Sequence, residues 1–486
     1  MSTDQLEDEF VAGDIETDPL LVRSPQASRP TPLPKVQLGA VYAIKLILPI
    51  AQTQVLPYLN VLVQGLAKSD GAKTGYYSGV VGSATSVAHL LTIYLWGRIS
   101  DRIGRIPVIV LGTTGIAVFT LLFGLSRTFA TVLLTRFLVG IFSGTTGAIH
   151  SVVGEITDAS NQSTAFPLYD IVSALGFVIG PLIGGTFANP ATLFPRWFDS
   201  PFWRIYPYFL PCLVTASIAM LTLFIAVFVL EETLPSKRRT KVTYDVLFSE
   251  ESSFSEMEGE IVQTTQAKPL SIKALLSIPV IRSICASSAA LGFVGSCFNT
   301  VFVLMAYTPI HDGGLALSPL AIGQALSVMG IVSIFLKLTM PVLLRRFGTL
   351  TVFRSCMQSW PVTFASMALL SFVAKQAVAM ESKAIEWVAV GFTLFMSRVG
   401  CMAFSIIMIL TKDHTPGTMS LGTSNGMAEF AQSSLAALGP TVVSSLFAFS
   451  ASNNILGGQL WVIIMVLVTL LGGSFAERIR KYRDDK

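Results

Sequence analysis

Four side chains that can exchange protons or form ion pairs lie inside long apolar stretches of this chain. They are His89, Asp170, Lys337 and Glu429. An internal repeat with an offset of 259 residues aligns Asp170 with Glu429, so that each acid takes the same place in its own half. A charged group at membrane depth is expensive and usually faces a partner or a water-filled cavity. Glu429 is the first candidate for a proton carrier, because desolvation favours the protonated acid, and static pairing is the alternative.

Three further basic residues lie within apolar stretches. Arg136 corresponds to Arg398 in the repeat, and Lys45 lies near the start of the first stretch. Lys45 and Arg136 are about two turns from the nearest interface, so their long side chains could instead extend to the polar surface.

The composition restricts the class of protein. The chain has 486 residues, of which 52% are hydrophobic and only 13% charged, and its mean hydropathy is +0.65. A soluble protein carries about 25% charged residues, so we expect a membrane protein. The five cysteines lie in apolar runs without metal or disulfide spacing, and the net charge of +4 does not indicate nucleic-acid binding. No nucleophile–base or metal constellation indicates an enzyme, a metal site or a cofactor.

Apolar runs of about 20 residues, each sufficient for one transmembrane helix, recur twelve times. We expect an all-α membrane protein with twelve transmembrane helices in two pseudo-symmetric six-helix bundles. The predicted parts are a disordered cytosolic N-terminal tail (1–35), an N-terminal bundle (36–230), a cytosolic linker (231–279), a C-terminal bundle (280–475) and a cytosolic tail (476–486).

The distribution of lysine and arginine predicts the orientation. With the N-terminus in the cytosol, 22 of the 33 basic residues lie on the cytosolic side, seven lie opposite and four lie within the spans. Basic residues collect on the cytosolic side, so both termini and the linker are expected there.

A block of alternating charge, GRISDRIGR, separates the second and third spans. It resembles the loop signature of the major facilitator superfamily in five residues: Gly97, Asp101, Arg102, Gly104 and Arg105. This resemblance implies a gate, in which Asp101 binds neighbouring arginines or caps a helix of the other half. Topological anchoring alone is the alternative. The C-terminal copy has Arg345 in place of the acid.

Two more motifs support the resemblance, which covers about residues 36–475. TRFLVG (135–140) resembles the family's fourth-span motif, whose arginine, here Arg136, is linked to proton transfer in proton-coupled relatives. GFVIGPLIGG (176–185) matches the fifth-span pattern of the antiporter branch, with simple helix packing as the alternative. Its key residues are Gly176, Gly180, Pro181, Gly184 and Gly185.

The resemblance also predicts which spans face each other across the two halves. In this superfamily the fifth span faces the eighth and the second faces the eleventh. This arrangement implies two ion pairs, Asp170 with Lys337 and His89 with Glu429, that close the cytosolic side. Candidate cavity residues are Gln52, Gln54, Asn299 and Tyr307.

The branch that the chain most resembles is the fungal drug:proton antiporters, near the tetracycline-resistance and zinc-induced-facilitator-like groups. This implies a monomer that exports a drug or secondary metabolite and is driven by the proton gradient. Metal or metal-chelate efflux is one alternative, and a non-transporting sensor on the same fold is another. ETDPLL fits an acidic dileucine signal for sorting adaptors through Glu16, Leu20 and Leu21, so vacuolar and plasma membranes both stay open.

Overall fold

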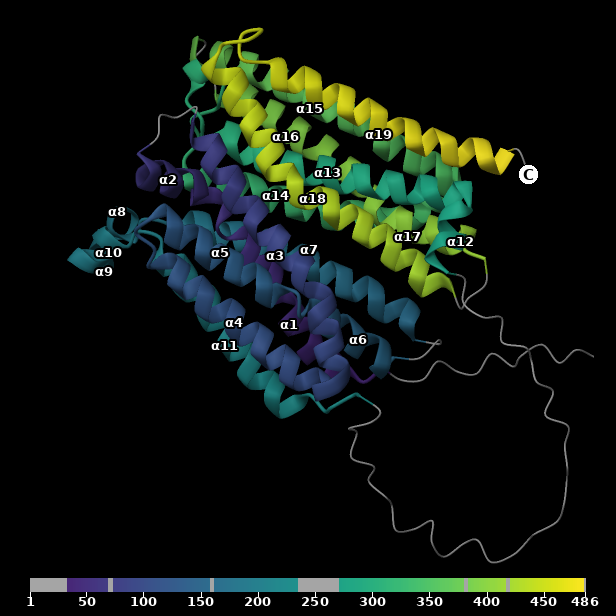
Figure 1. Ribbon diagram of the computed structural model, residues 1–486. Helices are drawn as coiled ribbons and strands as arrows, with labels where there is room; N and C mark the ends of the chain where they lie inside the picture. The colour runs from purple at the N-terminus through teal and green to yellow at the C-terminus, as the bar shows by residue number, and fades with distance from the viewer. Residues whose placement is uncertain are drawn as a thin grey trace, which may run out of the picture.

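The computed structural model describes residues 33–68, 73–157, 161–234, 271–379, 383–416 and 420–484, and this part of the chain is all-helical apart from its turns and loops. Figure 1 shows two bundles, a purple-to-teal half and a green-to-yellow half, packed side by side. The prediction of an all-α protein built from two bundles is confirmed.

The first half contains helices α1 to α11. Their bounds are α1 (Lys35–Thr53), α2 (Leu56–Ala67), α3 (Thr74–Ile103), α4 (Arg105–Gly124), α5 (Phe129–Ser143), α6 (Thr146–Ile156), α7 (Gln162–Phe187), α8 (Pro190–Leu193), α9 (Pro195–Phe198), α10 (Pro201–Ile205) and α11 (Phe209–Val229).

The second half contains α12 to α19 and a short 3₁₀ helix. Their bounds are α12 (Ile272–Ser277), α13 (Pro279–Tyr307), η3 (Ile310–Asp312), α14 (Pro319–Phe347), α15 (Thr349–Ala379), α16 (Lys383–Cys401), α17 (Ala403–His414), α18 (Leu421–Ser452) and α19 (Leu460–Asp484). The short α12 lies inside the predicted linker, and α19 continues beyond residue 475, where the bundle was predicted to end.

Within the described residues, eleven helical segments are long and apolar enough to cross a membrane, counting α1–α2, α5–α6 and α16–α17 as single segments. The remaining predicted crossing is α7, whose described apolar part is Ile171–Phe187. Successive crossings alternate in direction, so α1 begins and α19 ends on one side, which we call the terminal side. The other side is the distal side.

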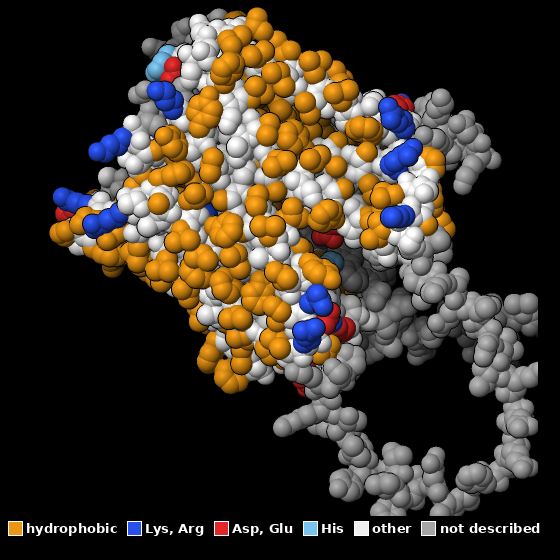
Figure 2. Space-filling model, in the orientation of Figure 1, with side chains coloured by type: hydrophobic (Ala, Val, Ile, Leu, Met, Phe, Trp, Pro, Cys, Tyr) orange, Lys and Arg blue, Asp and Glu red, His pale blue; other side chains and the backbone are white. Residues whose placement is uncertain are grey.

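The outer surface fits a lipid environment. Figure 2 shows hydrophobic side chains over the flanks of both halves, with lysine and arginine gathered toward the two ends. Large apolar side chains of α11 and α14 illustrate the pattern, since Phe228 and Phe335 are 75% and 64% exposed. A water-soluble protein rarely exposes so large a continuous apolar surface.

Within the described residues, three of the crossings are interrupted. The first is interrupted at Gln54 and Val55, just before Pro57, which has no N–H to continue the helical hydrogen bonds. The fourth and tenth, which correspond in the repeat, are interrupted at Gly144–Thr145 and at Met402. Each of these two breaks follows a buried arginine on the same crossing, as described below.

Besides smaller contacts of α2 with α13 and α14 and of α3 with α13, the two halves meet through two helix pairs, α3 with α18 and α7 with α14. These are the second and eleventh crossings and the fifth and eighth, so the predicted pairing of spans is confirmed.

Candidate functional site

A cavity of about 250 Å³ lies between the two halves on the terminal side. His150 of α6 comes from the first half, and all the other lining residues come from the second. The second-half residues are Ser288, Lys337, Phe404, Ser405, Ile407, Met408, Thr411, Asn425, Ala428, Glu429 and Gln432. Figure 2 shows acidic and histidine side chains in a hollow between the halves. The cavity is therefore shared between the two bundles, as a transport pathway requires.

The distal side of the same interface is closed by direct helix contact. A Cβ added to Gly323 of α14 would lie 2.5 Å from the Pro181 carbonyl oxygen of α7. A Cβ added to Gly79 of α3 would lie 1.8 Å from Ser444 Oγ of α18. Glycine at these positions allows the backbones to approach closely. The structure is thus open between its halves on the terminal side and closed on the distal side.

Hydrogen bonds between uncharged groups reinforce the distal closure. Between α14 and α7, Ser327 Oγ donates to the Val178 carbonyl (2.8 Å). Between α18 and α3, Thr441 donates through its backbone N to Ser83 Oγ (3.1 Å) and through its Oγ1 to the Gly79 carbonyl (3.2 Å). Between α2 and α13, Asn60 Nδ2 donates to the Val303 carbonyl (3.2 Å), and Tyr307 donates to Gln64 Oε1. Among the described residues, every ion pair lies within one half and none joins the two.

The cavity brings together three ionisable side chains. Glu429 and His150 are exposed to it, and Lys337 is half-buried. The centres of the His150 and Tyr169 rings lie 4.9 Å apart. Lys45 Nζ, also in the first half, lies 4.4 Å from the centre of the Tyr169 ring. Sequence reasoning missed His150, although its position on the fourth crossing, facing the second half, could have indicated it.

The predicted pair of His89 and Glu429 is absent from this structure. His89 Nδ1 instead lies 2.8 Å from Ser143 Oγ, within the first half, while Glu429 faces the cavity. The physical reason is the conformation, because α3 and α18 touch near their distal ends and Glu429 lies at the terminal end of α18. The predicted pair of Asp170 and Lys337 cannot be placed, since the Asp170 side chain lies outside the described part of the chain.

Arg136 and Arg398 are buried in equivalent broken crossings, with 8% and 9% of their surface exposed. The Arg136 guanidinium lies 5.9 Å from the centre of the Phe123 ring, and its Nε has no hydrogen-bond partner. Arg398 contacts only uncharged groups among the described residues: Ser397 Oγ at 3.3 Å, Asn299 Oδ1 at 3.5 Å and the Phe298 ring at 6.0 Å. Neither arginine has a described carboxylate within ion-pair distance.

The fifth-span motif packs against the break in the first crossing. A Cβ added to Gly176 would lie 2.5 Å from Pro49 Cγ, and one added to Gly180 would lie 2.0 Å from Thr53 Oγ1. A Cβ added to Gly184 would lie 1.8 Å from the Gln54 carbonyl oxygen. Gly185 faces the other half, since a Cβ added to it would lie 2.8 Å from the Pro319 carbonyl oxygen of α14. The motif therefore fixes α7 between α1 of its own half and α14 of the other.

The loop block forms an ion network on the terminal side. Arg105 Nη1 lies 2.7 Å from Asp101 Oδ1, and Arg105 Nη2 lies 2.7 Å from Glu155 Oε1. Glu232 accepts hydrogen bonds from the backbone N–H groups of Arg105 (2.9 Å) and Ile106 (3.2 Å) at the start of α4. Burial opposes ionisation of Glu232, but these and neighbouring N–H donors outweigh it and lower its pKa.

One of the two expected contacts of Asp101 is seen in this conformation. Asp101 pairs with the neighbouring Arg105, whereas the described cap is made by Glu232 on α4 of the same half, and no described contact of Asp101 reaches the other half. Gly104 makes this cap possible, because its φ is +110° and a Cβ there would lie 2.5 Å from Glu232 Oε2. Glu155, at the end of α6, pairs with the same Arg105. Gly97 has open space around it, and Arg102 is exposed.

None of the four predicted cavity residues lines the cavity between the halves. Gln54 is fully buried, accepts a hydrogen bond from Tyr58 (2.8 Å) and contacts Cys212 Sγ (3.7 Å). Asn299 binds Arg398, and Tyr307 forms the distal contact with Gln64. Gln52 is half-buried.

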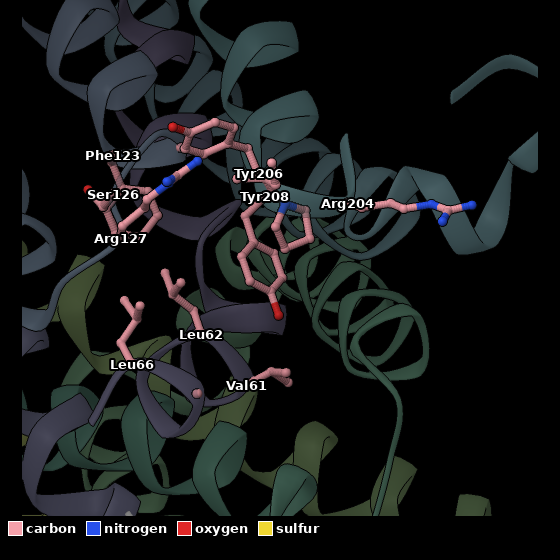
Figure 3. Close-up of a pocket in the computed structure, with 13 residues that line it drawn as sticks. Val61, Leu62, Leu66, Phe123, Ser126, Arg127, Arg204, Tyr206 and Tyr208 are labelled. Atoms are coloured by element: carbon pink, nitrogen blue, oxygen red, sulfur yellow. The ribbon is translucent and has the colours of Figure 1, made fainter. Parts of the chain in front are cut away.

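A larger cavity, of about 590 Å³, lies on the distal side. Figure 3 shows its leucine and tyrosine lining, with the Arg127 guanidinium beside Tyr206 at 4.6 Å. All its lining residues belong to the first half: Val61, Leu62, Gly65, Leu66, Phe123, Gly124, Ser126, Arg127, Arg204, Ile205, Tyr206, Pro207 and Tyr208. Because it does not lie between the halves, it is not the pathway that their movement would open and close.

Comparison with known proteins agrees with this architecture. The chain is 39% identical over 476 residues to the Major facilitator-type transporter psiT2 of Psilocybe cyanescens, which covers 91% of this chain and 90% of the relative. It is 27% identical to Efflux pump azaK of Aspergillus niger, covering 94% and 93%. It is 28% identical to Protein ZINC INDUCED FACILITATOR 1 of Arabidopsis thaliana, covering 86% and 85%.

Among solved structures, an inward-facing, occupied bacterial homologue of the human lysosomal transporter Spinster matches with a TM-score of 0.66 and 13% identity, covering 91% of this chain and 96% of that one. The model of the Major Facilitator Superfamily matches residues 55–440. With that family match, the relative at 39% identity and the shared two-bundle fold, the chain belongs to the major facilitator superfamily of secondary transporters, and it is not an enzyme.

Proposed function

We propose that this chain exports a small organic solute from the cytosol in exchange for protons. The observation that supports the proposal most directly is the cavity that the two halves share. It contains a carboxylate, an amine and an imidazole, and it is open on one side of an interface that is closed on the other.

The proton would be carried by Glu429. In this conformation its carboxylate is exposed in the cavity, where it can exchange protons with water on the terminal side. When the terminal side closes, the cavity walls would exclude water, and desolvation favours the neutral acid. A proton taken up on the distal side would therefore be released when the terminal side reopens and Glu429 is hydrated again.

Lys337 and His150 have supporting roles in this proposal. Lys337 lines the same cavity, and its positive charge favours the ionised Glu429 carboxylate, and so release of the proton on the terminal side. His150 lines the same cavity, and an imidazole can hold a second proton or contact the solute. Arg136 and Asp170 are further candidates for the proton-transfer step, as the family resemblance implies.

Export rather than uptake is favoured by the fifth-span glycine motif and by the similarity to Efflux pump azaK. We propose that the terminal side faces the cytosol, because most of the basic residues lie there. On this proposal residues 36–230 and 280–475 are the moving bundles and 231–279 is the cytosolic linker. The dileucine signal at 16–21 lies outside the described residues, so both plasma and vacuolar membranes are possible addresses.

The test starts from the native solute. Metabolite profiling of a deletion strain identifies the compound that accumulates, and its transport is then measured in proteoliposomes under an imposed pH gradient. We expect Glu429→Gln to abolish the dependence on the pH gradient. Asp199→Asn, on an exposed loop of the distal side, is the matched control and should behave as wild type. Unchanged proton coupling in Glu429→Gln would refute the assignment of the carrier.

Efflux of a metal chelate is a second candidate, supported by the 28% identity to Protein ZINC INDUCED FACILITATOR 1. It makes a different prediction, because the deletion strain would lose tolerance to zinc, and the purified protein would move radioactive zinc only together with an organic chelator. A sensor that does not transport would leave both vesicle assays blank.

A further inference from the structure

We propose that the exported solute carries an anionic group, a carboxylate, sulfonate or phosphate, which binds Arg136 and Arg398 in turn on its way through the protein. The inference rests on the proposed transport function and adds the charge class of the solute. It is carried by the position, burial and partners of these two guanidinium groups.

The two arginines occupy equivalent places in the two halves. Arg136 lies on α5 and Arg398 on α16, each on the distal part of a crossing that is broken a few residues further on, at Gly144–Thr145 and at Met402. Each guanidinium is more than nine-tenths buried and lies over a phenylalanine ring. Each half therefore holds one buried cation at an equivalent place.

The described partners of these cations are too weak to balance their burial. Both rings lie about 6 Å away, which is the outer limit of a cation–π interaction. The contacts of Arg398 with Asn299 and Ser397 are long hydrogen bonds to uncharged groups, and Arg136 Nε has no acceptor. A buried guanidinium normally takes a carboxylate or phosphate, whose planar or tetrahedral oxygens match its donors. An anionic solute would supply that acceptor.

A basic group lines the cavity on a helix that packs against the helix of Arg398. Lys337 of α14 lines the cavity, and α14 packs against α16, which carries Arg398. An anion that enters the cavity from the terminal side thus meets Lys337 before it can reach Arg398. Glu429 is the described acid of the cavity, and the positive charge of Lys337 in the same cavity opposes its repulsion of an anion.

The charge of the solute determines how transport responds to voltage. If one proton enters for each monoanion that leaves, each turnover transfers two positive charges inward. For each charge transferred, a membrane potential of about 59 mV changes the equilibrium concentration ratio of the solute tenfold. An anion would therefore be concentrated about 100-fold further for each ~59 mV of membrane potential. A neutral solute would gain about tenfold, and a monovalent cation would gain nothing.

Binding is tested with two probes that share a ring and have opposite charge, phenyl phosphate and phenyltrimethylammonium. Each is titrated at constant ionic strength against the purified full-length protein in detergent, with the thermal unfolding midpoint as readout. Phenyl phosphate should raise the midpoint and phenyltrimethylammonium should not. Stabilisation by the cation alone, by both equally or by neither would overturn the inference.

Variants locate the effect. Arg136→Gln and Arg398→Gln should each weaken the apparent affinity for phenyl phosphate by about tenfold or more, because a charge-assisted contact is lost. Arg136→Lys and Arg398→Lys keep the charge and should restore part of the affinity, which separates loss of binding from misfolding. Arg196→Gln is the control, since Arg196 is exposed on α9. Wild-type affinity in both glutamine variants would contradict the assignment of the site.

A transport measurement separates the inference from the proposed function. The compound from the deletion strain is assayed in proteoliposomes under a potassium diffusion potential and, separately, under a pH gradient. A cationic or neutral compound driven by the pH gradient would overturn the inference and leave the proposed function intact. An anionic compound driven by voltage but indifferent to the pH gradient would support the inference and refute proton exchange.

Discussion

Replacing Gly184 by alanine should force α7 away from the break between α1 and α2. An added Cβ would lie 1.8 Å from the Gln54 carbonyl oxygen and 2.8 Å from its carbonyl carbon. A carbon and a carbonyl oxygen approach to about 3.3 Å at closest, so the backbones must separate by about 1.5 Å. The obstacle is backbone, so no change of rotamer relieves it.

The size of the effect follows from the cost of overpacking. Inserting one methyl group into a close-packed interior costs about 1–3 kcal/mol, and the upper end applies here because two helices must shift. For a unit the size of the first half, about 3 kcal/mol corresponds to a fall of roughly 6–12 °C in the unfolding midpoint. Alanine is also a better helix former than glycine by up to about 1 kcal/mol, which acts in the opposite direction.

The control removes that opposing term. Gly39→Ala lies on α1 at a position where an added Cβ meets nothing within 4 Å, so it gains the same helix propensity without the clash. Both variants are compared with wild type by thermal unfolding in detergent and by transport in vesicles. If Gly184→Ala unfolded within 1 °C of Gly39→Ala and transported at the wild-type rate, the close packing of α7 on the α1–α2 break would be wrong.

Two further predictions concern the cap of α4 on the terminal side and the contact between the halves on the distal side. Glu232→Gln should cost about 0.5–1 kcal/mol at neutral pH, because N–H donors hold the pKa of this partly exposed carboxylate below its ordinary value of 4.5. A carboxylate whose pKa is lowered on folding stabilises the protein above about pH 4.5, and this stability is lost as the pH falls through the pKa of the folded state. The unfolding midpoints of Glu232→Gln and wild type should therefore converge in acid. A difference between the two midpoints that does not depend on pH would contradict the cap. Gly323→Ala should loosen the distal closure, because its Cβ would lie 2.5 Å from the Pro181 carbonyl oxygen. A cysteine placed at Ser83 should then react several-fold faster with an impermeant thiol reagent applied from the distal side, and a rate equal to that in Gly473→Ala, where a Cβ meets nothing within 4 Å, would count against it.

Much of the fold was predictable because the signals are local or periodic. Apolar runs of bilayer length locate the crossings, and the spacing of Gly176, Gly180 and Gly184 predicts one face of α7 that accepts another helix. The sequence indicated which helices face each other only through the family resemblance, since pairing between halves is not encoded in any local pattern.

The site was less predictable because it depends on which conformation the two halves adopt. The prediction of a pair between His89 and Glu429 treats the terminal side as closed, whereas in this structure it is open and each side chain contacts something else. The role of Glu232 was missed for another reason. This acid is far from α4 in sequence, and only the packing of α11 on α4 brings it to the start of that helix.

The two sides of the interface differ in chemistry, and on the proposed function this difference places protonation at one step of the cycle. The described distal contacts are glycine-mediated backbone approaches and hydrogen bonds between uncharged groups, and they include no carboxylate, amine or imidazole. On the terminal side, Glu429, Lys337 and His150 are hydrated while the cavity is open and would lose water when it closes. Because desolvation acts on charged forms, protonation should alter the equilibrium for terminal closure and leave the intrinsic stability of the distal contacts unchanged.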